Sequence, residues 1–226
     1  MDEDLKQEFE REITLMKDLR HPNIVQFVGA SNVKDNLAIL IEYAPFGSLS
    51  SVLSKSKLSY LMKLTILLET AKALQFLHLN RVIHRDIKPQ NILVFSLEPK
   101  SSVHIKLTDF GTSRFISDTT MTVTKNVGTT LYMAPEALGK NPRIDKSADI
   151  YSFGILMWEL LYERQPFAEY DWQSDVENHV KNGGRLPLDN SSLNPEFTKL
   201  VEDCWKHDPS TRPSASEVVQ RLSELI

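Results

Sequence analysis

The chain has 226 residues, of which 41% are hydrophobic and 25% charged, a composition typical of a folded globular protein. Its 26 basic and 30 acidic side chains give a net charge of −4, which argues against nucleic acid or an anionic membrane as a partner. The single cysteine, Cys204, excludes an internal disulfide, and the sequence shows neither a signal peptide nor an apolar run of membrane-spanning length, so we expect a cytoplasmic protein.

The N-terminal part of the chain is predicted to contain one helix and two strands. Apolar residues recur every three or four positions over residues 3–19, which predicts a helix with one apolar stripe. The apolar runs at 24–30 and 37–44 flank a turn-rich segment and predict a strand pair.

The rest of the chain is predicted to be mainly helical. Residues 59–79 are apolar around most of a helical circumference, so we expect a helix buried in the core. A hairpin with strands in 91–95 and 103–110 follows. Residues 112–130 are polar and lack periodicity, as in a mobile surface loop. Helical patterns then return at 148–162, 195–206 and 214–226.

Polar side chains with a common chemistry follow the long apolar helix. Asp86 lies in a loop between that helix and a short strand, where a scaffold can hold a carboxylate at a cleft. Asn91 and Asp109 are oxygen donors at strand ends, and Mg²⁺ prefers such ligands together with phosphate oxygens. Lys88 adds a mobile positive charge beside Asp86. This set favours phosphoryl transfer over hydrolysis or hydride transfer.

Three motifs occur in an order that resembles the protein kinases: HRDIKPQN at 84–91, DFG at 109–111 and APE at 134–136. The segment DIYSFG at 149–154 resembles the buried helix that supports the kinase catalytic loop. DPSTRPSASEVV at 208–219 resembles the family's C-terminal segment. The motifs extend across most of the chain, so chance agreement is excluded.

The resemblance implies an α+β, protein-kinase-like fold. A truncated, β-containing N-lobe would occupy residues 1–43, and a mainly helical C-lobe would occupy residues 44–226. The implied reaction is transfer of the ATP γ-phosphoryl group to Ser or Thr hydroxyls of protein substrates, with Mg²⁺, in intracellular signalling. Lys88 and Thr129 match the Ser/Thr class, and residues 203–214 resemble its tyrosine-kinase-like branch. APE, Arg212 and Thr129 disfavour a small-molecule phosphotransferase.

The same resemblance implies roles for the polar set. Asp86 would be the catalytic base, Lys88 the cation on the transferring phosphate, and Asn91 and Asp109 the magnesium ligands. For Asp86 and Asn91, the competing interpretation is a turn-forming residue and a cap. His84 has a catalytic side-chain type, but in the family it packs beneath the residue that corresponds to Phe110, so we expect a structural role.

The adenine site implied by the resemblance lies around the end of the second strand. Ile41 falls at the gatekeeper position. The Glu42 carbonyl and the Ala44 amide are the expected hinge partners of adenine, and Leu93 is the apolar floor of the site. Ordinary strand-end packing is the alternative at these positions.

Further family positions concern support and regulation. Glu12 matches the helix glutamate that pairs with the ATP-contacting lysine, although a solvated acidic helix face is the alternative. Glu136 and Arg212 would form the family's buried ion pair. Arg85 could bind a phosphate on the loop that follows the DFG motif, or that loop could be simply polar. Its candidate acceptors are Thr119, Thr120, Thr122 and Thr124.

Two parts of the kinase phosphate site do not occur in this sequence. No glycine precedes Gly29, so there is no Gly-rich loop before the first helix, and the position of the ATP lysine would fall before Met1. Either the sequence gives only part of a kinase domain, or the protein lacks these strands and serves as an inactive, pseudokinase-like scaffold. In both cases an uncovered strand face predicts reduced stability or association with another kinase or regulator.

Overall fold

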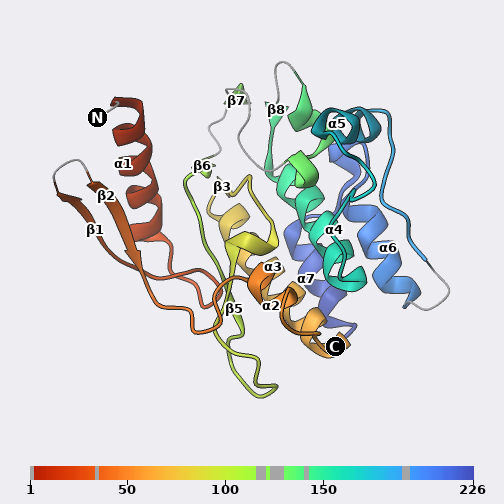
Figure 1. Cartoon of the computed structure of the whole chain (residues 1–226), viewed down its shortest axis with the longest axis horizontal. Coiled ribbons are helices and arrows are strands. Elements are labelled where there is room, and N and C mark those ends of the chain that lie inside the picture. Colours follow the sequence, from red (N-terminus) through yellow and green to blue (C-terminus); the bar gives the residue numbers. More distant parts are fainter. Residues whose placement is uncertain (1–2, 34–35, 116–120, 123–129, 140–142, 190–193) are drawn as a thin grey trace.

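In the computed structural model, helices of the C-terminal part make up most of the molecule, with a small helix-and-hairpin unit at one end (Figure 1). α1 and the β1–β2 hairpin lie at one end of the long axis, α5 and α6 lie toward the other, and α7 lies between α3 and α6. The structure describes residues 3–33, 36–115, 121–122, 130–139, 143–189 and 194–226.

The N-terminal unit consists of the helix α1 (Glu3–Asp18) and the antiparallel strands β1 (Phe27–Val33) and β2 (Asn36–Ile41). The predicted helix and strand pair are therefore confirmed, with different strand bounds. The start of the first apolar run pairs elsewhere, because Ile24 and Val25 lie beside Leu107 in the C-terminal part. An apolar run identifies a strand but not its partner.

One face of the β1–β2 hairpin is apolar and open to solvent. A register shift between Phe27 and Gly29 interrupts the alternation of β1 and leaves Gly29 opposite Leu40. Val28, at this shift, is 64% exposed. Leu40 on β2 is 50% exposed. The expected uncovered strand face is thus present in the structure.

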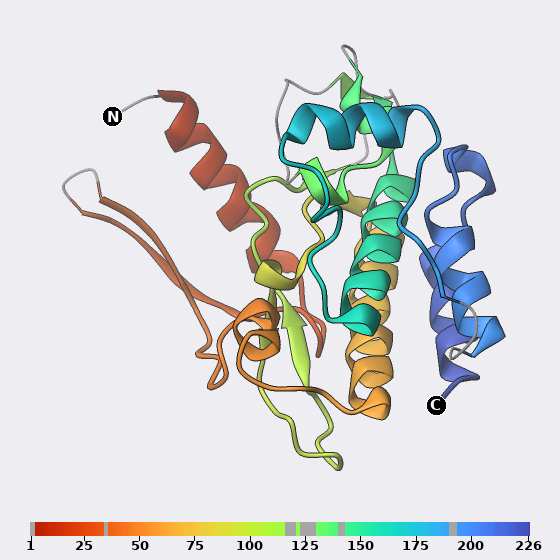
Figure 2. The same cartoon turned by 45° about the vertical axis from the view of Figure 1, so that its right-hand side comes forward.

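The core of the C-terminal part is built on two long helices, α3 (Tyr60–Leu79) and α4 (Lys146–Tyr162). They lie side by side in Figure 2, and each begins at a side chain that accepts a backbone N–H, Ser59 for α3 and Asp145 for α4. α7 (Ala215–Ser223) packs against α3, and α6 (Pro195–Cys204) packs against α4.

Two helices were not predicted from the sequence. α2 (Leu49–Leu53) has only five residues, too few to show a helical period. α5 (Gln173–Lys181) buries only Val176 and Val180, so its apolar stripe is weak.

The remaining strands are short and occur in pairs. β4 (Ile92–Val94) and β5 (Ile105–Leu107) form the predicted hairpin. The loop after the DFG motif was predicted to lack regular structure, and this is wrong in part. In this loop, β6 (Arg114–Phe115) pairs with β3 (Val82–Ile83). β7 (Met121–Thr122) pairs with β8 (Arg143–Ile144), which lies after the loop. A 3₁₀ turn follows β7 at Thr130–Tyr132.

The fold class is α+β with a predominance of helix, as predicted. The division into lobes at residues 43 and 44 stays a prediction. Within the described part of the chain, no helix has the length and apolar character needed to cross a membrane.

Candidate active site

Asp149, near the start of α4, holds the backbone of the loop that carries Asp86 through hydrogen bonds. The two carboxylate oxygens of Asp149 accept the backbone N–H groups of His84 at 2.9 Å and Arg85 at 2.7 Å. Burial alone would raise the pKa of Asp149, but the hydrogen bond and charge of His78, 2.8 Å away, hold that pKa below its usual value. An ionised Asp149 therefore holds the loop backbone, including the left-handed conformation of Arg85 (φ 73°).

His84 has a structural role at the base of the loop. Burial lowers its pKa, so the neutral imidazole is favoured. Its Nδ1 accepts the Asp86 amide at 3.3 Å, and its Nε2 lies 3.0 Å from the Thr108 carbonyl, to which a neutral ring can donate. The ring meets Phe110 edge to face with 5.3 Å between centroids. The expected packing of these two side chains is confirmed.

Asp86, Lys88 and Asn91 form one cluster. The Asp86 carboxylate is 7% exposed, and its Oδ2 lies 2.6 Å from Lys88 Nζ. Asn91 Nδ2 donates to the same oxygen at 2.8 Å and to the Asp86 carbonyl at 2.9 Å. A 3₁₀ turn at Pro89–Asn91 brings the asparagine back toward the aspartate. The carboxylate is thus oriented from two sides.

Asp109 lies near this cluster because the chain after β5 runs beside Asn91. The Thr108 amide donates to the Asn91 carbonyl at 2.9 Å, and the next residue, Asp109, turns outward with a left-handed backbone (φ 64°) and an exposed side chain. The side-chain nitrogen of Asn91 donates to Asp86, so the Asn91 Oδ1 atom is the one that can bind a cation. Asn91 and Asp109 therefore fit Mg²⁺ as oxygen ligands.

A larger all-protein metal site does not accompany this pair. Among the residues that the structure describes, no group of three or more His, Cys, Asp or Glu side chains could hold a metal ion. Mg²⁺ commonly binds through one or two carboxylates and completes its shell with water and phosphate oxygens. Asn91 and Asp109 are therefore enough as protein ligands for a Mg²⁺ ion that is also bound by the phosphates of a nucleotide.

Glu12 reaches the same region from α1. A Cβ atom on Gly111 would lie 3.3 Å from Glu12 Oε2 and 3.4 Å from Asp109 Oδ1, so the glycine allows both carboxylates to approach. Burial and the charge of Asp109 raise the pKa of Glu12, and a hydrogen bond from the Phe110 amide opposes this rise. The structure therefore brings Glu12 to the DFG segment rather than to a solvated helix face.

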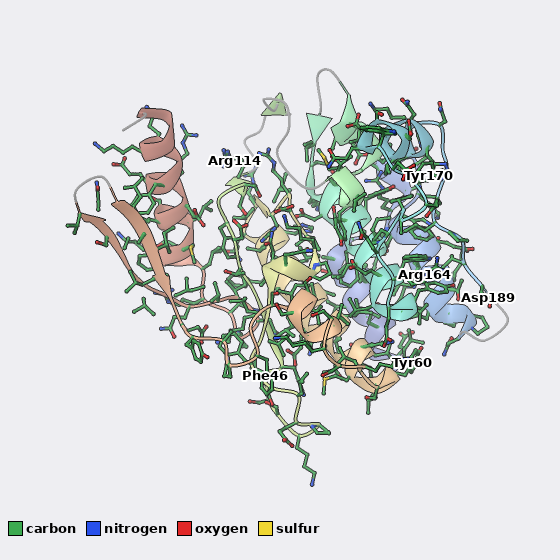
Figure 3. The ribbon with its side chains drawn as sticks, viewed as in Figure 1. Phe46, Tyr60, Arg114, Arg164, Tyr170 and Asp189 are labelled. Atoms are coloured by element: carbon green, nitrogen blue, oxygen red, sulfur yellow. The ribbon has the colours of Figure 1, made fainter. Side chains whose placement is uncertain are left out.

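Two of the residues expected around adenine, Glu42 and Ala44, lie on one segment that folds back onto β4, the strand that carries Leu93. Glu42 and Ala44 follow β2 directly, and the Phe46 amide donates to a carbonyl of β4 at 3.2 Å (Phe46 is labelled in Figure 3). Ser48 then forms a bridge with Leu93, which packs against the core. The geometry brings the hinge segment and the predicted apolar floor together.

Arg85 presents an unusual feature beside the catalytic loop. Its Nε and Nη2 atoms are buried and have no hydrogen-bond partner among the described residues. Burial and the charge of the neighbouring Arg114 lower the pKa of Arg85. The guanidinium nevertheless stays protonated, because arginine does not lose its proton in proteins. Arg114 lies on β6, where Figure 3 labels it. The unsatisfied donors of Arg85, beside a second cation, favour an anion there.

The scaffold contains a predicted ion pair and contacts that the sequence did not indicate. Arg212 meets Glu136 through two hydrogen bonds of 2.6 and 2.8 Å, which confirms the predicted pair. The bond of His78 to Asp149 was not predicted, because it joins positions 71 residues apart and no local pattern marks it.

Comparison with known proteins agrees with this geometry. The protein kinase domain family matches residues 1–222. Over 100% of its own length, the chain is 36% identical to the serine/threonine-protein kinase STY46 of Arabidopsis thaliana. Over 97% of its own length, it is 38% identical to the serine/threonine-protein kinase CTR1 of the same organism. It is 37% identical, over 98%, to the probable serine/threonine-protein kinase gdt4 of Dictyostelium discoideum.

The chain spans only part of these relatives, namely 38% of STY46, 27% of CTR1 and 14% of gdt4. On the family match and the site geometry together, the chain belongs to the protein kinase domain family.

Proposed function

We propose that this chain is the catalytic region of a serine/threonine-protein kinase that uses ATP and Mg²⁺. The observation that carries the proposal is the position of Asp86, held by Lys88 and Asn91 beside the exposed carboxylate of Asp109. The names of its relatives support Ser and Thr as the acceptors. A tyrosine-kinase-like subgroup, protein substrates and a cytoplasmic location belong to the same proposal.

Each residue of the site has a defined part in the proposed reaction. Asp86 orients the substrate hydroxyl and accepts its proton as the hydroxyl oxygen bonds to the γ-phosphorus, while the bond to the β–γ bridging oxygen breaks and ADP leaves. Lys88 stabilises negative charge on the transferring group. Asn91 and Asp109 would hold Mg²⁺, which supplies neutralisation of the phosphate oxygens when bound.

Glu42, Ala44 and Leu93 would bind the adenine end. The Glu42 carbonyl would accept a hydrogen bond and the Ala44 amide would donate one, while Leu93 forms the apolar floor. These contacts fix the nucleotide so that its phosphate end meets Asp109.

Phosphate transfer to Ser- and Thr-containing peptides tests the proposal directly. We expect Asp86→Asn to lower the rate by a factor of about 10² to 10⁴, because the variant keeps the shape of the side chain but not the base. Asp171→Asn, which changes an exposed aspartate outside the site, should retain the wild-type rate. Equal rates for wild type and Asp86→Asn would contradict the proposal.

Calorimetry with MgATP separates binding from catalysis. Binding that is lost in Asp109→Asn would show that the site holds the metal–nucleotide complex. A folded wild-type chain that binds no MgATP would instead support the alternative, a scaffold that uses the open face at Val28 and Leu40 to contact another protein.

A further inference from the structure

Lys106 connects the hinge segment to the strand that leads to Asp109. It lies at the centre of β5, directly opposite Leu93 in the β4–β5 register. Its Nζ lies 2.7 Å from Glu42 Oε1 and 2.8 Å from Glu42 Oε2, so one ammonium group contacts both carboxylate oxygens. Lys106 therefore joins two parts of the proposed adenine site.

The contact is part of a three-segment arrangement. The Gln26 amide donates to Glu42 Oε1 at 2.7 Å, and the Glu42 amide donates to the Gln26 carbonyl at 3.1 Å. One residue earlier, Val25 donates its amide to Leu107 on β5 at 2.9 Å. The segment at 25–26 thus lies between the hinge and β5, and Lys106 reaches across it to Glu42.

The environment of the pair makes it stronger than an ordinary surface ion pair. The side chains of Lys106 and Glu42 are 18% and 23% exposed, so solvent screens them only in part. The ammonium also lies 4.9 Å from the centroid of the Phe95 ring, a distance at which a cation and an aromatic face attract. These contacts restrict both long side chains to one geometry.

We infer that Lys106 is a positioning residue for the nucleotide, an inference that rests on the proposed function. By holding the Glu42 side chain, it fixes the backbone whose carbonyl would receive adenine. Lys106 is also three residues before Asp109 on the same segment. Its contact with Glu42 therefore fixes the distance between the adenine end of the site and the metal ligand Asp109. A hinge fixed before binding loses less conformational entropy when the ligand arrives.

A merely structural role is the competing explanation. Lys106 could stabilise the hairpin, in which case its removal would lower global stability and leave nucleotide affinity, measured on the folded chain, unchanged. The two explanations therefore differ in a local measurement at the hinge and in a binding measurement.

The experiment compares wild type, Lys106→Met, Lys106→Arg and the matched control Lys100→Met, which changes an exposed lysine at the tip of the same hairpin. Adenosine and ADP are the probes in calorimetry, because adenosine reports on the adenine end alone. Hydrogen exchange of the amides at 42–44, without nucleotide, reports on the hinge directly. The urea midpoint of each variant reports on global stability.

We expect Lys106→Met to raise the Kd of adenosine and ADP about tenfold, equivalent to about 1.4 kcal/mol. Exchange at 42–44 should accelerate, with little change in the urea midpoint. Lys106→Arg should restore both properties to within about threefold of wild type, since a guanidinium can contact both oxygens. Lys100→Met should behave as wild type.

Two results would overturn the inference: unchanged Kd and hinge exchange in Lys106→Met, or an increase in exchange throughout the chain with a lowered urea midpoint. If wild type binds neither probe, the proposed function fails for this chain. The exchange comparison still decides whether Lys106 fixes the hinge, so the two failures can be distinguished.

Discussion

At the scale of single residues, the Arg85 guanidinium stands out because part of its hydrogen-bonding capacity is unsatisfied in the described part of the chain. Two of its nitrogens are buried without a partner among the residues that the structure describes, and leaving such donors unsatisfied costs about 1–3 kcal/mol each. A phosphate on the loop after the DFG motif would satisfy them through charge-assisted hydrogen bonds, and Arg114 would add a second cation. Of the candidate acceptors, Thr119, Thr120 and Thr124 lie outside the described residues.

We expect phosphatase treatment to lower the peptide-phosphorylation rate of wild type about tenfold or more, because the loop would lose its anchor at Arg85. Arg85→Met should have the low rate before treatment and show no further loss. Arg11→Met, which changes an exposed arginine on α1, is the matched control. Undiminished activity after replacement of all four threonines by alanine would refute this mechanism.

The sequence predicted the residues of the candidate site but not the contacts that support them. Asp86, Lys88, Asn91 and Asp109 stand in contiguous motifs, and the structure brings them together. The supports of the candidate site are contacts between distant segments, such as His78 with Asp149 under the catalytic loop and Lys106 with Glu42 at the hinge. Residue type and spacing along the chain do not specify such pairs.

At the scale of elements, the close packing of α4 against α6 depends on Gly154. A Cβ atom there would lie 3.0 Å from Cys204 Cβ and 3.3 Å from the Trp205 backbone nitrogen, and neither atom belongs to the flexible end of a side chain. The helices can therefore approach this closely only if position 154 has no side chain.

We expect Gly154→Ala to lower the free energy of unfolding by about 1–2 kcal/mol. Overpacking costs about 1–3 kcal/mol, and the better helix propensity of alanine returns at most about 1 kcal/mol. Urea denaturation measures the difference. Gly139→Ala is the control, because the nearest atom to its added Cβ is 3.9 Å away and its φ of −79° suits alanine. A stabilised Gly154→Ala variant would show that the two helices separate at little cost.

Long elements could be predicted from the sequence because their apolar patterns extend over several turns. The helix predicted at 59–79 differs from α3 by one residue, and the predicted 3–19 differs from α1 by one residue. α2 was missed because five residues show no helical period, and the two-residue strands were missed because they pair with segments distant in the chain. Tertiary contacts, and not local propensity, define such short elements.

At the scale of the whole molecule, the pH dependence of stability should contain a contribution from one partly buried carboxyl group, Glu159 on α4. Burial raises its pKa to about 7, although a hydrogen bond of 2.6 Å from the Tyr132 hydroxyl lowers it in part. In the unfolded chain the pKa returns to about 4.5. The folded state therefore binds more protons than the unfolded state between these two values, and stability falls as the pH rises through this window.

We expect Glu159→Gln to remove this dependence, because glutamine can still accept from Tyr132 but does not ionise. Relative to wild type, the variant should gain about 2 kcal/mol of unfolding free energy between pH 5.5 and pH 8, since each pKa unit corresponds to about 1.4 kcal/mol. Urea denaturation at the two pH values measures this difference, which cancels the contributions of other groups. Glu202→Gln, which changes an exposed glutamate on α6, should follow the wild-type curve. Parallel curves for wild type and Glu159→Gln would mean that Glu159 ionises as readily in the folded chain as in water, and its hydrogen bond to Tyr132 would then compensate fully for its burial.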